Sequence, residues 1–155
     1  QSELITAVIA TAAFTDDVML LATRLGEIKK TALSEFEVVR RSGLIAMNLE
    51  LGDQLVSARL AQETDDVLLV TANGRAIRFG IATLRLASRG SGGVRGIRLT
   101  SDDDSLVGMI SAPTSSKASV LVVTENGMGK RTNMDEYNMM CKCAAAIRAL
   151  KSGAE

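Results

Sequence analysis

Three stretches of the chain share one pattern of apolar and polar positions. Each has an apolar run that ends in threonine, a turn closed by glycine, and a second short run. The apolar runs begin at Leu20, Leu68 and Leu121. Their glycines are Gly26, Gly74 and Gly127, which lie 48 and 53 residues apart. An apolar run that reaches an x-Gly turn, twice as Asn-Gly, predicts a β-hairpin with a type I′ turn.

The remainder of each repeat predicts two more strands. Residues 43–49 and 93–99 each begin with a glycine and continue as an apolar strand. Acidic turns at 50–53 and 102–104 then precede Leu55-Val56 and Leu106-Val107, which open a fourth strand. Residues 4–10 repeat that fourth-strand pattern. Four short strands per repeat, without helical periodicity, predict an all-β fold of propeller-type blades.

The blades are expected at about 16–64, 65–117 and 118–155, and residues 1–15 are expected to complete a preceding blade. An apolar residue recurs after each hairpin, at Phe36, Leu84 and Tyr137, and is predicted to pack in the core. Residues 139–150 leave an alternative open. Ala144-Ala145-Ala146 favours a helix by propensity, whereas the repeat aligns Ile147-Arg148 with Ile97-Arg98 in a strand. The repeat is the preferred prediction.

Composition excludes several kinds of chemistry. The 155 residues include no histidine, so histidine-dependent nucleophile pairs, general bases and metal ligands are all excluded. Cys141 and Cys143 are predicted to be two reduced thiols, too few for a zinc site. Asp102-Asp103-Asp104 is predicted to be a solvated turn, because it lacks the ligand spacing of a calcium loop. No metal, cofactor or catalytic residue is therefore expected.

Targeting signals are absent from the pattern as well. No apolar run approaches the ~18–20 residues of a membrane span. The first residues, Gln1-Ser2-Glu3, do not resemble a signal peptide. A cytoplasmic protein without a membrane partner is expected, and the opening in mid-pattern favours an excised domain or fragment.

The formal net charge is zero, but basic and acidic residues are strongly separated along the chain. Residues 67–101 contain six arginines and no acidic residue, while the acids gather in turns. One basic position recurs in all three hairpins, at Lys30, Arg78 and Arg131. A stripe of recurring cations on successive blades would suit a bent polyanion, and the alternative is a solvated face. The predicted DNA contacts are Lys29, Lys30, Arg40, Arg41, Arg75, Arg78, Arg89, Arg95, Arg98, Lys130 and Arg131.

The predicted stripe can be tested by charge reversal. Reversing Lys30 and Arg78 to glutamate should weaken DNA binding and flatten its salt dependence.

The glycine-rich residues 88–96 allow two interpretations, a phosphate cradle or a connection that crosses between blades with little side-chain bulk. They match neither a P-loop nor a dinucleotide fingerprint.

The motifs together resemble a known family, the C-terminal domain of the DNA gyrase A subunit or of its topoisomerase IV counterpart. The resemblance covers residues 3 to about 137. It is carried by Thr15-Asp16-Asp17, residues 21–24, residues 26–36 with Lys29-Lys30-Thr31, residues 41–49, Gly52-Asp53-Gln54-Leu55, Ala76-Ile77-Arg78-Phe79, Gly93-Val94-Arg95-Gly96-Ile97, and residues 122–127 with 129–132.

The resemblance implies a β-pinwheel, a propeller-like disc whose blades exchange a strand and whose basic rim wraps duplex DNA. Three repeats would be about half of a disc of about five or six blades. The implied function is sequence-independent DNA binding and bending or wrapping, through phosphates, in DNA supercoiling. The implied partners are the gyrase B subunit, together with the remainder of the gyrase A subunit, in the bacterial cytoplasm at the nucleoid. Strand cleavage and ATP hydrolysis would lie elsewhere in that ATP-dependent type II topoisomerase, and this domain would need no cofactor.

The sequence departs from the family in two places. The Gln-Arg-Arg-Gly-Gly-Lys-Gly type segment known as the gyrase box is absent, and its nearest counterpart is residues 89–96. Residues 138–144 stand where a basic, glycine-rich segment is expected. The alternative function is a propeller that serves as a platform for protein–protein interaction. A continuous positive rim would favour DNA, and an apolar patch on a disc face would favour a protein partner.

Overall fold

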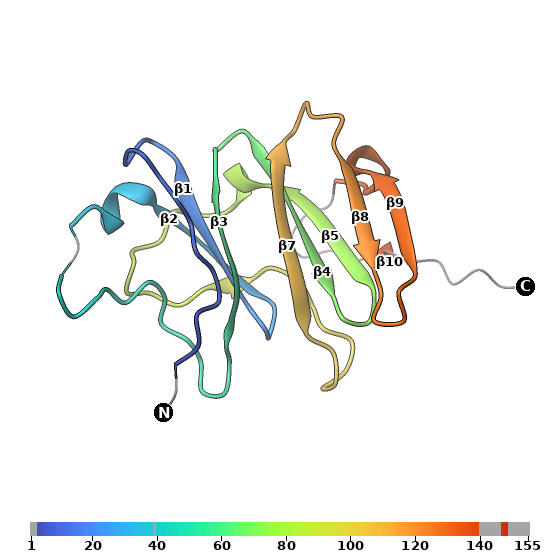
Figure 1. Ribbon diagram of the computed structural model, residues 1–155, viewed down its shortest axis with the longest axis horizontal. Helices are drawn as coiled ribbons and strands as arrows, with labels where there is room; N and C mark the ends of the chain where they lie inside the picture. The colour runs from blue at the N-terminus through green and yellow to red at the C-terminus, as the bar shows by residue number, and fades with distance from the viewer. Residues whose placement is uncertain (1–2, 39, 140–146, 149–155) are drawn as a thin grey trace, which may run out of the picture.

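The computed structural model describes residues 3–38, 40–139 and 147–148. Within them the chain forms three antiparallel hairpins, one in each predicted repeat (Figure 1). The hairpins pair β1 (Val18–Thr23) with β2 (Glu27–Ala32), β4 (Asp65–Thr71) with β5 (Arg75–Gly80), and β8 (Ser119–Val123) with β9 (Gly129–Asn133).

All three hairpin turns have the same construction. The N–H of Gly26 donates to the carbonyl of Thr23 at 3.0 Å, and the Thr23 hydroxyl accepts from the N–H of Glu27 at 3.2 Å. Gly26, Gly74 and Gly127 have φ of 87°, 72° and 80°, and no other residue type in the described chain has a positive φ. The predicted type I′ turn is therefore wrong, since it needs positive φ at two successive residues. The turns are three-residue loops that end in a left-handed glycine.

Two of the sheets have four strands, and the blades exchange strands. The first sheet has the order β3-β1-β2-β6, with β3 (Leu55–Ala61) and β6 (Val94–Arg95) at its two edges. The second has the order β7-β4-β5-β10, with β7 (Leu106–Pro113) and β10 (Ile147–Arg148) at its edges. The edge strands β6 and β10 each come from the repeat that follows their sheet, which ties successive repeats together. The predicted all-β, propeller-like pinwheel is confirmed.

Some predicted strands are absent. Residues 4–10 and 43–49 have no strand assignment, and only Val94–Arg95 of residues 93–99 forms one. A strand such as β6 needs the hairpin of the preceding repeat as its partner, and the described residues before β1 contain no hairpin. The strand prediction for Ile147-Arg148 is correct. In the sheet, however, this strand is the counterpart of Val94-Arg95, not of Ile97-Arg98 as the sequence alignment predicted. Most of the competing helix falls outside the described residues.

A short 3-10 helix follows each hairpin, a feature that the repeat pattern did not predict. These helices are η1 (Leu33–Phe36), η2 (Ile81–Thr83) and η3 (Met134–Glu136). Leu84 and Tyr137, which directly follow two of them, are buried, and Phe36 is half-buried. The predicted core packing is confirmed for Leu84 and Tyr137, whereas Phe36 borders an open hollow.

The core lies between sheets rather than within one. The larger cluster joins side chains of the first and second sheets, including Leu20, Ile28, Leu69 and Phe79. A smaller cluster joins Leu68 and Ala76 of the second sheet to Val120, Met134 and Tyr137 of the third repeat. Among the described residues, no helix is long and apolar enough to cross a membrane.

Candidate nucleic-acid interface

The recurring basic position of the repeat is buried in the first two sheets. The side chain of Lys30 is 4% exposed and lies 2.8 Å from the carboxylate of Glu63. The side chain of Arg78 is 5% exposed, and its Nε and Nη2 donate to the Asp66 carboxylate at 3.0 and 2.7 Å. Neither cation is free to meet a phosphate. The prediction that these two residues contact DNA is therefore wrong for this structure.

Both buried cations connect one repeat to the next. The Lys30 ammonium donates to the carbonyl of Ile81, and Arg78 Nη1 donates to the carbonyl of Met134 at 2.7 Å. Each acceptor is the first residue of the 3-10 helix that follows the next hairpin. A charge-assisted bond to a buried carbonyl satisfies both groups at the seam between sheets. Reversal of Lys30 and Arg78 to glutamate is thus expected to disrupt folding, not to report on DNA.

Lys29 is also buried, on the other face of its strand. Its ammonium donates to the carbonyls of Ala46 and Ser91, each at 2.9 Å, and to the carbonyl of Arg89. Burial lowers the pKa of Lys29; the nearby Glu35 carboxylate raises it, and the Arg89 guanidinium lowers it further. Instead of contacting DNA as predicted, Lys29 joins two connections from different repeats.

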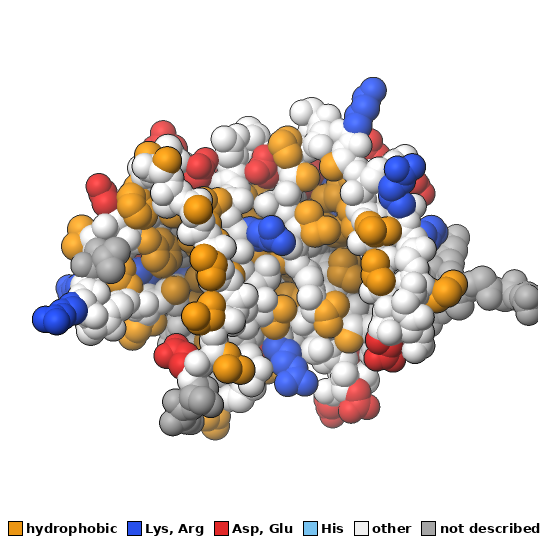
Figure 2. Space-filling view, in the orientation of Figure 1, with side chains coloured by type: hydrophobic (Ala, Val, Ile, Leu, Met, Phe, Trp, Pro, Cys, Tyr) orange, Lys and Arg blue, Asp and Glu red, His pale blue; other side chains and the backbone are white. Residues whose placement is uncertain are grey.

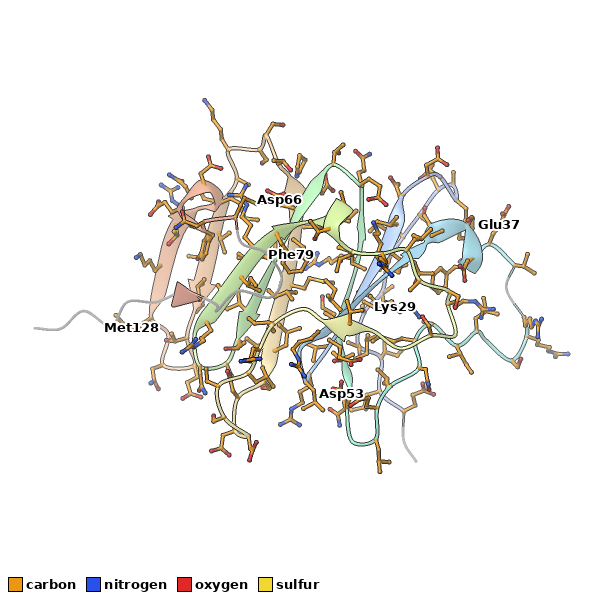
Figure 3. The ribbon with its side chains drawn as sticks, turned by 180° about the vertical axis from the view of Figure 1, so that it is seen from behind. Lys29, Glu37, Asp53, Asp66, Phe79 and Met128 are labelled. Carbon is orange, nitrogen blue, oxygen red and sulfur yellow. The ribbon has the colours of Figure 1, made fainter. Side chains whose placement is uncertain are left out.

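These two connections carry the exposed arginines, and we call residues 40–48 and 85–98 the crossing loops. The second crosses from the second sheet to the first, passes Lys29 at Arg89 and Ser91, and pairs with β2 through Val94 and Arg95 (Figure 3). Additional bonds join the loops, because Asn48 N–H donates to the Ser91 carbonyl and Arg89 Nη1 donates to the Ile45 carbonyl.

Glycines in the second crossing loop allow close passage over β2. A Cβ on Gly93 would lie 3.1 Å from the Ile28 carbonyl oxygen, and one on Gly96 would lie 2.7 Å from the Ile28 side chain. These contacts explain the lack of side-chain bulk and support the interpretation as a crossing connection. The close contacts with β2 favour this interpretation over a phosphate cradle.

The remaining predicted cations lie at the surface. Arg40, Arg41, Arg95, Arg98, Lys130 and Arg131 are exposed, and Arg75 and Arg89 are half-buried. Arg85 is exposed on the second crossing loop and was missed, although the acid-free run from 67 to 101 contains it. Among the described residues, none of these surface cations forms an ion pair; such pairs involve only Lys30 and Arg78.

The surface cations gather on the crossing loops rather than in an even stripe around the blades. On the face shown in Figure 2, the lysine and arginine side chains are separated by apolar and uncharged surface. The acid-free loop from 85 to 98 lies on the opposite side, toward the viewer in Figure 3. That loop provides the densest positive charge and is the candidate interface.

Two aspartates of the acidic turns have a structural role. Asp104 is buried, and its Oδ1 accepts from the N–H groups of Asn73 and Ser105 at 3.1 and 3.0 Å. Burial raises the pKa of Asp104, but hydrogen bonds from Asn73, Thr71 and Thr100 outweigh it and hold the pKa below the usual value. Asp53 holds the first hairpin turn in the same way. The prediction of a solvated turn is correct only for Asp102 and Asp103, which are exposed.

No cluster of three or more potential metal ligands is present in the part of the chain that the structure describes. The second crossing loop offers the positive charge of its exposed arginines. Such a surface is suited to phosphate contacts along a nucleic-acid backbone.

Comparison with known proteins gives concordant results. A family model described as DNA gyrase C-terminal domain, beta-propeller, matches residues 17–62, 65–113 and 118–140. The chain is 40% identical over 152 residues to the DNA gyrase A protein of Dehalogenimonas lykanthroporepellens, covering 97% of this chain and 18% of that protein. It is 39% identical over 151 residues to the DNA gyrase A protein of Salmonella typhimurium, covering 97% of this chain and 17% of that one.

Two solved structures resemble the fold closely. The C-terminal domain of DNA topoisomerase IV matches with a TM-score of 0.82 and 28% identity, over 90% of this chain and 43% of that one. The DNA gyrase A C-terminal domain matches with a TM-score of 0.80 and 28% identity, over 94% of this chain and 47% of that one. The chain thus spans less than a fifth of its curated relatives and just under half of these solved structures.

Proposed function

Because the chain belongs to the family of DNA gyrase C-terminal domains, we propose that it binds duplex DNA without sequence preference through the crossing loops. The observation that carries this proposal is the acid-free run of residues 67–101. Within that run, the side chains of Arg85, Arg95 and Arg98 are exposed. Arginine contacts to phosphates would position the duplex without reading its bases.

The two crossing loops would act as one surface. Lys29 connects them through the carbonyls of Ala46, Arg89 and Ser91, so the two loops are held together. Cations on two linked loops can follow a curved backbone, which suits bending or wrapping. Lys130 and Arg131 lie on the third hairpin and would extend the contact.

The domain would take part in a topoisomerase reaction without performing chemistry. Its proposed partners are a gyrase B-type subunit, together with the remainder of a gyrase A-type subunit, in the bacterial cytoplasm at the nucleoid. Cleavage of DNA and hydrolysis of ATP would belong to those other parts, and no cofactor is proposed for this domain.

A matched pair of double variants tests the interface. Arg95→Gln with Arg98→Gln removes two charges from a crossing loop, whereas Arg59→Gln with Lys117→Gln removes two charges elsewhere. If each arginine neutralises one phosphate, the first variant should reduce the slope of log K against log salt by about 1.8. Binding is measured by fluorescence anisotropy on a short duplex at several salt concentrations. Equal slopes for the two variants would reject the assignment to the crossing loops.

Wrapping is tested separately from binding. The protein is mixed with nicked circular DNA, the nick is sealed, and the linking number is read after deproteinisation. A shift toward positive supercoils is expected if the domain wraps DNA as proposed. Salt-sensitive binding without such a shift would reject wrapping and leave binding intact. Absence of binding at low salt would favour the protein-interaction platform instead.

A further inference from the structure

One apolar position of the repeat is exposed every time it occurs. It lies two residues after the residue predicted to pack in the core, at Val38, Leu86 and Met139, with the same spacings of 48 and 53 residues as the turn glycines. The exposed fractions of these side chains are 76%, 59% and 53%. A single exposed aliphatic residue is ordinary in a protein surface, but its recurrence at one position of three repeats calls for a reason.

The exposure of Leu86 arises beside a complete neighbouring sheet. Leu86 forms a parallel bridge with Lys30 of the first sheet, and the N–H that follows it donates to the Lys30 carbonyl at 2.8 Å. Met139 forms the same bridge with Arg78 of the second sheet. Each of these two sheets has four strands. Val38 has no such bridge in the described chain, so only Leu86 and Met139 combine this position with an intact neighbour.

A second exposed aliphatic residue lies close to Leu86 on the same sheet edge. The second crossing loop returns to β2 at Val94, which lies opposite Ile28, whereas Leu86 lies opposite Lys30. Because these partners are two residues apart on one strand, Leu86 and Val94 are about 7 Å apart along the edge. Val94 is 45% exposed. We call Leu86 and Val94 the apolar pair.

Arginine flanks each member of the apolar pair. Arg85 precedes Leu86 and Arg95 follows Val94, and the side chains of both arginines are exposed. The loop that carries all four, residues 85–98, contains no acidic residue and faces the viewer in Figure 3. A partner that binds at this edge must therefore present negative charge and apolar surface close together.

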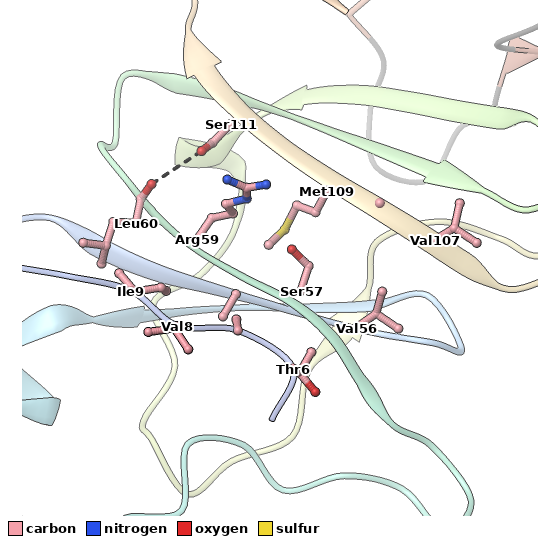
Figure 4. A pocket seen from close by; sticks show the side chains of 13 residues that line it. Thr6, Val8, Ile9, Val56, Ser57, Arg59, Leu60, Val107, Met109 and Ser111 are labelled. Carbon is pink, nitrogen blue, oxygen red and sulfur yellow. Dashed lines mark hydrogen bonds between the residues drawn. The ribbon is translucent and has the colours of Figure 1, made fainter. Parts of the chain in front are cut away.

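The opposite edge of the sheets offers no comparable surface. There β3 and β7 lie side by side along a groove of about 630 Å³, and the Ser111 hydroxyl donates to the Leu60 carbonyl at 3.4 Å (Figure 4). Arg59 is the only charged residue among those that line the groove. The groove is smaller than one base pair with its backbone, so a duplex does not fit in it. The edge that carries the crossing loop is the one on which a duplex can lie.

The backbone of duplex DNA has the chemistry that this edge requires. Each strand alternates charged phosphates with deoxyribose rings, whose C–H groups form apolar surface along the grooves. Contacts to phosphate and sugar hold a protein on DNA without reading its sequence. Proteins that bend DNA use apolar side chains together with arginines in this way.

We propose that the apolar pair packs against deoxyribose groups of the bound duplex, while the two flanking arginines contact phosphates. This inference rests on the proposed DNA binding and adds to it a contact that salt does not weaken. Burial of apolar surface depends little on ionic strength, whereas phosphate contacts release counterions. Met139 makes the same contact from the next repeat, so apolar contacts recur along the duplex.

Leu86→Gln tests the apolar contact. The matched control is Leu51→Gln, because Leu51 is fully exposed in a turn outside the crossing loops. Binding to a short duplex is measured by fluorescence anisotropy at several salt concentrations, after circular dichroism has shown that both variants fold. Leu86→Gln should weaken binding about three- to tenfold at every salt concentration, with an unchanged slope of log K against log salt. Leu51→Gln should bind as the wild type does.

The outcomes separate this inference from the proposed function. If the wild-type chain shows no salt-dependent binding, both are overturned. If the wild type binds and Leu86→Gln binds equally well, only the apolar contact is overturned, and a protein partner becomes the occupant of this position. A reduced salt slope for Leu86→Gln would also overturn the apolar contact, because the substitution would then act through the arginines.

The identity of the sugar provides a second test. An RNA duplex of the same sequence carries a 2′-hydroxyl on every sugar, which makes this surface polar and changes the shape of the groove. Leu86→Gln should therefore lose more affinity for the DNA duplex than for the RNA duplex, measured at the same salt concentration. Equal losses on the two duplexes would overturn the assignment to deoxyribose.

Discussion

The basic position that recurs in the three hairpins has one role in the first and second sheets and another at the third hairpin. Lys30 and Arg78 are buried, paired with carboxylates and bonded to the following repeat. Arg131 occupies the same position of the hairpin and is exposed. The three residues have the same charge and the same local structure, so the difference arises from the neighbouring repeat. A recurring charge in a repeat protein can therefore be a structural bond wherever a neighbour is present.

Replacing Arg78 is expected to have the largest effect. Arg78→Met would leave the Asp66 carboxylate buried without its cation and the Met134 carbonyl without its donor. The expected cost in the free energy of unfolding is about 3–5 kcal/mol. Urea denaturation at low micromolar concentration measures it.

Arg131→Met is the matched control for this comparison. Its expected effect on the free energy of unfolding is within about 0.5 kcal/mol, as for other surface changes. If Arg78→Met does not fold, the double variant Asp66→Leu, Arg78→Met should recover most of the stability, since both partners of the pair are then apolar. Similar losses from Arg78→Met and Arg131→Met would contradict the assigned difference.

Lys29→Met should have an intermediate effect. The three carbonyls that accept from Lys29 would lose their donor, and relief of the buried charge would offset part of that loss. The expected cost is about 2 kcal/mol, with faster proteolytic cleavage in the crossing loop from 85 to 98. Lys130, its counterpart on the third hairpin, is exposed, so Lys130→Met should change neither measurement.

The pH dependence of this variant has a definite sign. Because the pKa of Lys29 is lowered from 10.5 in the folded protein, the unfolded chain binds more protons between the two pKa values. This group therefore makes the wild-type stability rise with pH across that alkaline window. The rise should be smaller in Lys29→Met, and an unchanged pH profile would show that the ammonium is not buried as described.

Asp104→Asn should have the smallest of these effects. The amide would replace charge-assisted bonds to the turn at Asn73 with weaker ones, at an expected cost of about 1–2 kcal/mol. Its pKa is lowered, so this contribution is present above the unfolded pKa and is lost as pH falls through the folded value. The difference from wild type, measured by urea denaturation, should therefore shrink below about pH 4. Asp102→Asn, at an exposed carboxylate, should have no measurable effect at any pH.

Much of the fold could be predicted from local pattern. Hairpin positions, the strands that open at Leu55 and Leu106, and the packing of Leu84 and Tyr137 all follow from a local pattern that recurs along the chain. The pairing of β6 and β10 could not be predicted in the same way. Val94 of β6 pairs with Ile28, some 65 residues earlier in the chain, and residues 93–99 by themselves do not indicate that partner.

The candidate site was predicted only in part, for a related reason. The acid-free run indicates the exposed Arg95 and Arg98, but it also contains the buried Arg78, and recurrence in the hairpins selected the buried Lys29 and Lys30. Whether a basic side chain is exposed depends on which carbonyls and carboxylates surround it after folding. The acceptors of Lys29 and Arg78 lie 12 to 62 residues away in the chain.

The sequence by itself determined the repeat, its hairpins, its turn glycines and the family, because each depends on neighbouring residues or on recurrence along the chain. The tertiary structure alone decided which cations form buried bonds between sheets and which are exposed. Those properties depend on segments brought together by exchange of strands between repeats. Identical positions therefore acquired different environments, and with them different roles.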